Sequence, residues 1–160
     1  MIAFLIRLLD RREPALSQAT TRDAAAIATL HGKSFHRGWS DGEIESLLFD
    51  RNVIAHRAMV GRGLVGFIFS RMAIDEAEIL SVAVAPARRG RGLSRQLVDL
   101  HLRRLAGIGV HRVFLEVDEG NIPARKLYAR AGFRDVGRRE AYYSNQRGRN
   151  AAALVLRRDL

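Results

Sequence analysis

The stretch LSVAVAPARRGRGLSRQLVDLHLRRLAG, residues 80–107, decides the fold of this chain. Its opening residues are mostly small or β-branched and apolar, as in a buried strand, and Pro86 closes that run. Further on, leucines recur at helical spacing, which predicts a helix from about Gly92 to Ala106 that the following glycines end. Between the strand and the helix lies a turn rich in arginine and glycine.

This turn has the composition of an anion-binding site. Backbone N–H groups in the first turn of a helix have no helical partner and can bind an anion. Gly90 and Gly92 lack a β-carbon, so the backbone can come close to a phosphate, and Arg89, Arg91 and Arg95 can neutralise its charge. The turn lacks the G-K-[ST] signature of nucleoside triphosphatases. Taken alone, it would be interpreted as an exposed basic loop.

A second glycine pattern, GRGLVG at residues 61–66, has the spacing of a dinucleotide-binding loop. That loop must follow a strand and open a helix, because the pyrophosphate binds at the helix N-terminus. Here the residues that follow, LVGFIFSRM, are β-branched and aromatic, which is typical of a strand. We therefore predict a hairpin turn at residues 61–63.

The rest of the chain predicts a mixed sheet flanked by helices. Thr21 can cap a helix over residues 20–35, and Ser40 with Glu43 has capping-box spacing at the start of a second helix over residues 39–49. The other expected elements are a helix at 121–132 and strands at 16–19, 53–60, 64–72, 77–86, 113–117, 133–143 and 151–160. This order indicates a single α/β (α+β) domain with a mostly antiparallel central sheet and one strand–helix–strand unit.

Length and composition limit the class of protein. The chain has 160 residues, enough for one domain at residues 15–160 after an N-terminal extension, residues 1–14, that we expect to be loosely ordered. It has no cysteine, which excludes disulfides, zinc–thiolate sites and cysteine nucleophiles and fits a reducing, cytoplasmic setting. The N-terminal apolar run is too short to span a bilayer, so no membrane role is expected, with a weak contact at a membrane surface as the minor alternative.

Charge and histidine content leave several functions open. The net charge of +10 attracts phosphates, whether on nucleic acid or on a nucleotide-like cofactor, and is also what an arginine-rich proteome would produce. The histidines have no shared metal-ligand spacing, so no metal site is expected. All of them are predicted to be structural or on the surface: His31, His36, His56, His101 and His111.

Several short motifs occur in a set order along the chain: VAVAP, RGRGLS, LEV, NIPARKLYARAGF and AYY. The run from Glu76 to Tyr143, about 70 residues, resembles the GNAT superfamily of N-acetyltransferases, and within it is most similar to the RimI-type ribosomal-protein alanine N-acetyltransferases. The dipeptide Trp39–Ser40 extends the likeness weakly toward the N-terminus. One position departs from the pattern, because Ser94 stands where the family prefers glycine or alanine.

The resemblance implies an acetyl-CoA-dependent enzyme and assigns roles to particular residues. Glu116 would take the proton of the acceptor amine, and Tyr128 would protonate the leaving thiolate. A strand edge would pair with the pantetheine amides and the basic turn would bind the phosphates. The implied cofactor contacts are Val82, Ala83, Val84, Arg89, Gly90, Arg91, Gly92, Leu93, Ser94, Arg95 and Asn121. Acceptor binding would fall to Trp39, Tyr142 and Tyr143. Apart from the resemblance, Glu78 is a second carboxylate that could contact the acceptor or be a rival base.

Each catalytic assignment has a structural alternative. Tyr128 lies at helical spacing from Ala124 and could simply pack in the core. Glu116 alternates with apolar residues, so it could be a solvated strand residue or one member of an ion pair. One of the consecutive tyrosines near the end of the chain is expected to pack, because neighbouring strand residues face opposite sides.

Three functions follow from these observations. The first is acetylation of a protein N-terminal α-amine, with the N-terminal alanine of a ribosomal protein as the RimI-like case. Transfer would be direct, because no cysteine could hold an acetyl group. The second is a GNAT enzyme that acts on lysine or on a small-molecule amine. The third is a non-catalytic basic RNA- or ribosome-binding module, which is less favoured because the aromatic residues are not interleaved with the arginines. For the enzyme we expect a monomer or weak dimer that requires no contact with nucleic acid.

Overall fold

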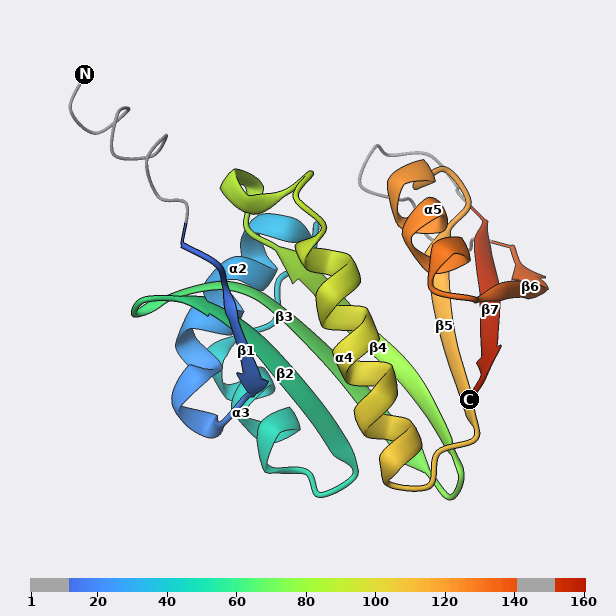
Figure 1. Cartoon of the computed structure of the whole chain (residues 1–160), viewed down its shortest axis with the longest axis horizontal. Coiled ribbons are helices and arrows are strands. Elements are labelled where there is room, and N and C mark those ends of the chain that lie inside the picture. The colour runs from blue at the N-terminus through green and yellow to red at the C-terminus, as the bar shows by residue number, and fades with distance from the viewer. Residues whose placement is uncertain (1–11, 141–151) are drawn as a thin grey trace.

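The computed structural model describes residues 12–140 and 152–160, which form one seven-stranded sheet with helices on both faces (Figure 1). The strand order is β1-β2-β3-β4-β5-β7-β6, and every neighbouring pair is antiparallel except β4 and β5. The strands are β1 (Ala15–Gln18), β2 (Val53–Val60), β3 (Gly63–Ala73), β4 (Glu76–Val84), β5 (Arg112–Asp118), β6 (Arg134–Arg139) and β7 (Ala153–Asp159). The helical segments are η1 (Thr21–Asp23), α2 (Ala24–Ser34), α3 (Asp41–Phe49), η2 (Pro86–Arg88), α4 (Leu93–Gly107) and α5 (Ile122–Arg130). The predicted mixed, mostly antiparallel sheet is confirmed.

Alternation along β3 separates two apolar cores. Phe67 and Phe69 face the side covered by α2 and α3, where they pack with Ile27 and Ile44. Ile68 faces the opposite side and packs with leucines of α4: Leu93, Leu97, Leu102 and Leu105. Successive strand residues face opposite sides of a sheet, so this one β-branched and aromatic strand supports both helical layers.

The capping residue of the first helical segment differs from the prediction. Thr20 has the extended N-cap conformation, and its N–H donates to Asp23 Oδ2 at 2.7 Å. Thr21 therefore lies inside the 3-10 turn and cannot cap it. At α3 the predicted capping box is confirmed, because Ser40 Oγ accepts from Glu43 N at 3.1 Å and Glu43 Oε2 accepts from Ser40 N at 2.8 Å.

The GRGLVG pattern is a hairpin turn, as predicted. β2 and β3 pair antiparallel on either side of it, and Gly61 has φ +58°, in the left-handed region that favours glycine. A strand follows the glycines where a dinucleotide-binding loop would need a helix. The pattern therefore has a conformational cause and is not a dinucleotide-binding loop.

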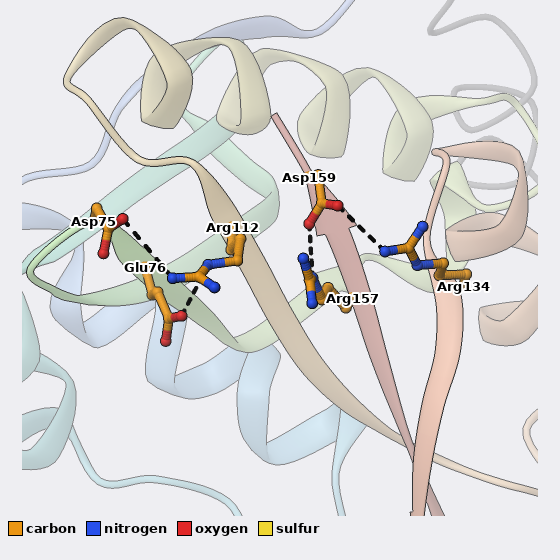
Figure 2. Close-up of polar contacts among 6 residues, drawn as sticks. All are labelled: Asp75, Glu76, Arg112, Arg134, Arg157 and Asp159. Carbon is orange, nitrogen blue, oxygen red and sulfur yellow. Dashed lines mark hydrogen bonds and ion pairs between the residues drawn. The ribbon is translucent and has the colours of Figure 1, made fainter.

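β4 and β5 are joined over a short seam. Their parallel pairing runs from Glu76 with Arg112 to Glu78 with Phe114 and ends there. Ion pairs of Arg112 on β5 link the two strands at this pairing (Figure 2). Its Nε lies 3.0 Å from Glu76 Oε1 on β4, and its Nη2 lies 3.9 Å from Oδ2 of Asp75, the residue before β4. Beyond the seam the two strands spread apart toward the starts of α4 and α5 (Figure 1).

A buried polar link connects the sheet to α4. His56 Nδ1 on β2 lies 2.7 Å from His101 Nδ1 on α4, and His101 Nε2 lies 2.6 Å from Ser70 Oγ on β3. Burial lowers the pKa of His101 to about 3, so the link is uncharged at neutral pH. Within the described ranges, no helix is long and apolar enough to cross a bilayer, and no three His, Cys, Asp or Glu side chains are grouped to hold a metal ion.

Candidate active site

The turn between β4 and α4 presents the unpaired end of the helix. Gly92 is the N-cap residue with φ +79°, and Gly90 has φ +73°. No protein heavy atom outside the neighbouring residues lies within 4 Å of a β-carbon built on either glycine, so the positive φ values are what the fold itself requires of these glycines. The first helical hydrogen bond runs from Gln96 N to Gly92 O at 3.0 Å. By this pattern the amides before it can bind an external acceptor: Leu93, Ser94 and Arg95.

The arginines of this turn contact neighbouring protein groups. Arg89 Nε donates to Val84 O at 3.0 Å, and Arg95 Nε donates to the two carboxylate oxygens of Asp99 at 2.8 and 3.0 Å. Each contact uses Nε, so the terminal nitrogens of both guanidinium groups can still donate to a phosphate. Arg91 is exposed at the helix start. The structure therefore brings the three predicted cations to one helix end, with two of them already oriented by the protein.

β4 offers a backbone edge next to this turn. β3 pairs with one edge of β4 as far as Val84, whereas in the described chain the edge toward β5 is unpaired past Glu78. The register with β3 shifts before Ser81 and leaves Leu80 bulged. Ser81 is 7% exposed, and its Oγ is the one buried side-chain oxygen without a hydrogen-bond partner among the described residues. An extended ligand can pair with a free strand edge, which is the contact predicted for residues 82–84.

An acidic groove of about 1090 Å³ opens between α3 and the sheet. Glu78 from β4 and Glu116 from β5 both line it, close to the point where the two strands separate. Its other walls include Trp39, Glu43, Leu47, Asp50, Arg71 and Leu80. The groove thus holds four carboxylates and one guanidinium, in a chain whose net charge is +10. Three of these carboxylates are ion-paired, Glu43 with Arg37, Asp50 with Arg71 and Glu116 with Arg139. Glu78 has no ion pair among the described residues, and its charge favours a positively charged ligand.

His31 holds Trp39 at the groove. Trp39 N donates to His31 Nδ1 at 3.1 Å, and the two rings stack with their centroids 4.3 Å apart. Burial lowers the pKa of His31, which keeps the ring neutral at physiological pH and its Nδ1 able to accept. The structure therefore places Trp39 in the same groove as Glu78 and Glu116.

The two candidate bases share the groove but differ in their partners. The Glu116 side chain is 36% exposed, and its Oε1 lies 2.9 Å from Nη2 of Arg139 on β6. The Glu78 side chain is exposed and makes no hydrogen bond or ion pair within the part of the chain that the structure describes. The ion pair that was the structural alternative for Glu116 is therefore present, and it occupies one of the two carboxylate oxygens. The geometry accommodates either residue as the base.

Two predicted residues belong to α5. Tyr128 is 7% exposed, and its ring meets Phe133 edge-on with centroids 5.7 Å apart. Burial raises the pKa of its phenol to about 12, so it stays protonated, which is the form that a general acid needs. Asn121 is the N-cap of α5, where its Oδ1 accepts from Ala124 N at 3.2 Å. Of the predicted catalytic pair, Glu116 lines the acidic groove and Tyr128 does not.

Sequence reasoning missed several groove residues. Glu43 was noted for its cap alone, and nothing in the sequence connected Asp50, Arg71 or Arg139 with the site. The one available signal was the position of Arg71 late in an apolar strand, where a charged residue marks an end that meets solvent. The predicted acceptor residues Tyr142 and Tyr143 lie outside the described residues.

Over residues 24–133 the sequence matches the acetyltransferase (GNAT) family. The chain belongs to the GNAT family. This GNAT chain is 30% identical over 141 residues to the [ribosomal protein bS18]-alanine N-acetyltransferase of Haemophilus influenzae, a match that covers 88% of this chain and 95% of the relative. The enzyme of the same name from Escherichia coli K12 is 27% identical over 140 residues, which cover 88% and 94%. A mycothiol acetyltransferase of Clavibacter michiganensis is 32% identical over 131 residues, which cover 76% of this chain and 43% of that protein.

Solved structures have the same fold. The ribosomal-protein alanine N-acetyltransferase of Escherichia coli superposes with a TM-score of 0.84 at 24% sequence identity, covering 91% of this chain and 93% of that one. Arabidopsis thaliana NAA60, solved in complex with acetyl-CoA, superposes with a TM-score of 0.82 at 19% identity, covering 92% and 98%. The predicted GNAT fold and the predicted activity class, an acyltransferase, are confirmed.

Proposed function

We propose that this GNAT enzyme transfers the acetyl group of acetyl-CoA to the α-amino group of a protein N-terminus, with the N-terminal alanine of a ribosomal protein as its preferred acceptor. The observation that carries the proposal is the acidic groove, in which Glu78 and Glu116 meet where β4 and β5 separate. Relatives named as bS18-alanine N-acetyltransferases match along 88% of the chain, which supports this choice of acceptor.

Acetyl-CoA supplies an activated acetyl group together with phosphates and amides that the described residues fit. The first-turn amides of α4, with Arg89 and Arg91, would hold the phosphates at the positive end of the helix. Ser94 would add a hydroxyl in the same turn. Residues 82–84 would pair with the pantetheine amides, and the amide nitrogen of Asn121 would donate to the same arm.

The acceptor amine must lose a proton before it attacks. An α-amino group has a pKa of about 7.7–8.0, so much of it is protonated at neutral pH. Glu116, or Glu78 in its place, would take that proton directly or through a water molecule. The amine nitrogen then bonds to the acetyl carbon while the carbon–sulfur bond breaks, and Tyr128 would give its proton to the departing sulfur. A backbone N–H near Val82 would stabilise the negative charge that develops on the acetyl oxygen.

The charge of the groove supports a cationic acceptor. A protein N-terminus enters as an ammonium group, and basic side chains that follow it would add to the attraction. Trp39, held by its stack on His31, supplies an apolar and aromatic wall for a small first side chain such as that of alanine. An acidic N-terminal segment would meet the Glu78 carboxylate, which has no ion pair among the described residues, and would be disfavoured.

Thiol release from acetyl-CoA tests the proposal, measured with peptides that begin with Ala, Ser, Met and Gly. We expect the fastest turnover with alanine and, by fragmentation mass spectrometry, an acetyl group on the α-nitrogen. The matched control is the same peptide with a blocked N-terminus and an internal lysine. If a folded protein that binds acetyl-CoA turned over none of these peptides, the N-terminal assignment would be wrong.

Paired substitutions separate the two carboxylates. Glu116→Gln and Glu78→Gln remove the same charge from the same groove, so a difference between them reports chemistry and not electrostatics alone. If Glu116 is the base, its variant loses about 10²–10⁴-fold in kcat, whereas the Glu78 variant mainly raises the peptide KM. The reverse result would assign the base to Glu78.

One observation favours a second candidate, a small-molecule amine as acceptor. The mycothiol acetyltransferase relative is 32% identical to this chain, although the match covers 43% of that protein. The same thiol-release assay with small primary amines distinguishes the two candidates, because a peptide enzyme would leave them essentially untouched. A non-catalytic RNA-binding module would instead show no thiol release and a steep salt dependence of polyanion binding.

A further inference from the structure

Arg139 reaches the candidate base across an intervening strand. In the sheet, β7 lies between β5 and β6, and Val155 of β7 is level with both Glu116 and Gly137. Arg139 pairs with Ala153, two residues from Val155, so it faces the same side of the sheet as Glu116. Its guanidinium spans β7 and places Nη2 at 2.9 Å from Glu116 Oε1.

The neighbouring arginine makes a different connection. Arg138 Nη2 lies 3.0 Å from Glu119 Oε2, and its Nη1 bonds Glu140. Neither of these carboxylates lines the acidic groove, whereas Glu116 does. Two consecutive arginines of β6 therefore each bind a carboxylate near the end of β5, and Arg139 alone of the two contacts a groove residue.

The fold does not depend on the Arg139–Glu116 contact. The Arg139 side chain is 69% exposed and that of Glu116 is 36% exposed, and ion pairs in water contribute little to stability. The contact does restrict Glu116, which otherwise has three rotatable side-chain bonds and an open groove beside it. It also occupies Oε1 and leaves Oε2 for a ligand in the groove.

We propose that Arg139 is a positioning residue for the transfer reaction. It holds the Glu116 carboxylate by one oxygen, so that the other oxygen is kept in place to accept the proton of the acceptor amine. Arg139 would thus affect proton removal from the amine. It would not affect acetyl-CoA binding, because the predicted cofactor contacts lie on β4, α4 and the start of α5. This inference rests on the proposed function, with Glu116 as the base.

Three variants test the proposal in the full chain. Arg139→Gln should lower kcat by about tenfold or more, a part of the 10²–10⁴-fold that a positioned base contributes, with the KM for acetyl-CoA unchanged. Arg139→Lys should recover at least part of that loss, because the ammonium group can still bind Oε1. Arg138→Gln is the matched control and should stay within about twofold of wild type, since its partners lie outside the groove.

A double variant checks that Arg139 acts through Glu116. Adding Arg139→Gln to Glu116→Gln should cause no further loss of kcat, because the group being positioned is already gone. The proposal is overturned if Arg139→Gln keeps the wild-type kcat, if Arg138→Gln falls as far, or if the two losses multiply.

A measurement that does not need catalysis can test the Arg139–Glu116 contact independently of the proposed function. The side-chain carboxyl ¹³C signal of Glu116, assigned by its disappearance in Glu116→Gln, should move in Arg139→Gln and stay in place in Arg138→Gln. An unmoved signal in Arg139→Gln shows that the arginine does not hold the carboxylate, whatever the acceptor. A moved signal in a protein that acetylates no peptide shows instead that the proposed function has failed, and the catalytic role of Arg139 fails with it.

Discussion

Replacing Tyr128 by phenylalanine removes the proposed general acid and keeps its ring. The ring is 7% exposed and lies edge-on to Phe133 at 5.7 Å between centroids, contacts that phenylalanine retains. We expect Tyr128→Phe to unfold near the wild-type Tm at pH 7. We expect its kcat to fall by about 10²-fold or more, because a positioned acid contributes 10²–10⁴-fold. The KM for acetyl-CoA should change little, since the hydroxyl acts on the departing sulfur.

Burial of Tyr128 also makes the free energy of unfolding depend on pH in the alkaline range. Burial raises its pKa from 10.0 to about 12, so at pH 10 an exposed phenol is half ionised and Tyr128 is about 1% ionised. The unfolded chain therefore releases this proton first as the pH rises. The stabilisation is complete below pH 10 and is lost as the pH rises through 12, by about 1.4 kcal/mol at pH 11.

Urea unfolding at pH 8 and pH 11 measures this loss in wild type and in Tyr128→Phe. The free energy of unfolding should fall by about 1.4 kcal/mol more in wild type, because phenylalanine has no proton to release. Equal losses in the two proteins would show that the phenol is not buried. A Tyr128→Phe enzyme with wild-type kcat between pH 7 and 10 would refute its role as the acid.

Other buried or charged groups have expected effects of their own. His101 has a folded pKa of about 3 against an ordinary value of 6.5, so its contribution to the free energy of unfolding is highest above pH 6.5 and falls by about 2 to 3 kcal/mol at pH 4.5. Urea unfolding of His101→Leu should show a smaller decrease in this free energy at acid pH. Ser81→Ala removes a hydroxyl that lacks a partner among the described residues, and should raise the free energy of unfolding by about 1 kcal/mol; a decrease would mean that a water molecule satisfies the hydroxyl. Peptides with glutamate in place of arginine after the N-terminal alanine should show a several-fold higher KM, and the difference should shrink at high salt; equal KM values would remove the acidic groove from acceptor recognition.

Local patterns in the sequence predicted the features that depend only on residues close together in the chain, such as helices, turns and helix caps. The turn and helix of residues 80–107 follow from leucine spacing and from Gly90 and Gly92, which adopt positive φ at little cost. The Ser40–Glu43 cap spans one helical turn. The predicted cap, Thr21, was wrong by one residue, because Thr20 and Thr21 have the same side chain and only the backbone conformation shows that Thr20 is the N-cap.

The acidic groove depends on contacts between distant parts of the chain. Glu78 and Glu116 become neighbours only because β4 and β5 pair for three residues and then part, a register that no local pattern encodes. Arg139 on β6 comes near Glu116 on β5 because both strands pair with β7, the last strand in the chain. The family resemblance supplied Glu116 as a candidate, and the sequence offered Glu78 as a second carboxylate. Only the fold shows that both line one groove.

The short pairing between β4 and β5 divides the sheet into two parts, β1–β4 and β5–β7–β6. The ion pair of Arg112 with Glu76 links these parts at the paired end. Acetyl-CoA, bound as proposed, would contact β4 on one side of the seam and Asn121, the N-cap of α5 just after β5, on the other. The acidic groove has walls on both sides of the seam, since Glu78 belongs to β4 and Glu116 to β5. A cofactor that spans the seam, as proposed, would therefore fix the position of Glu116 relative to Glu78.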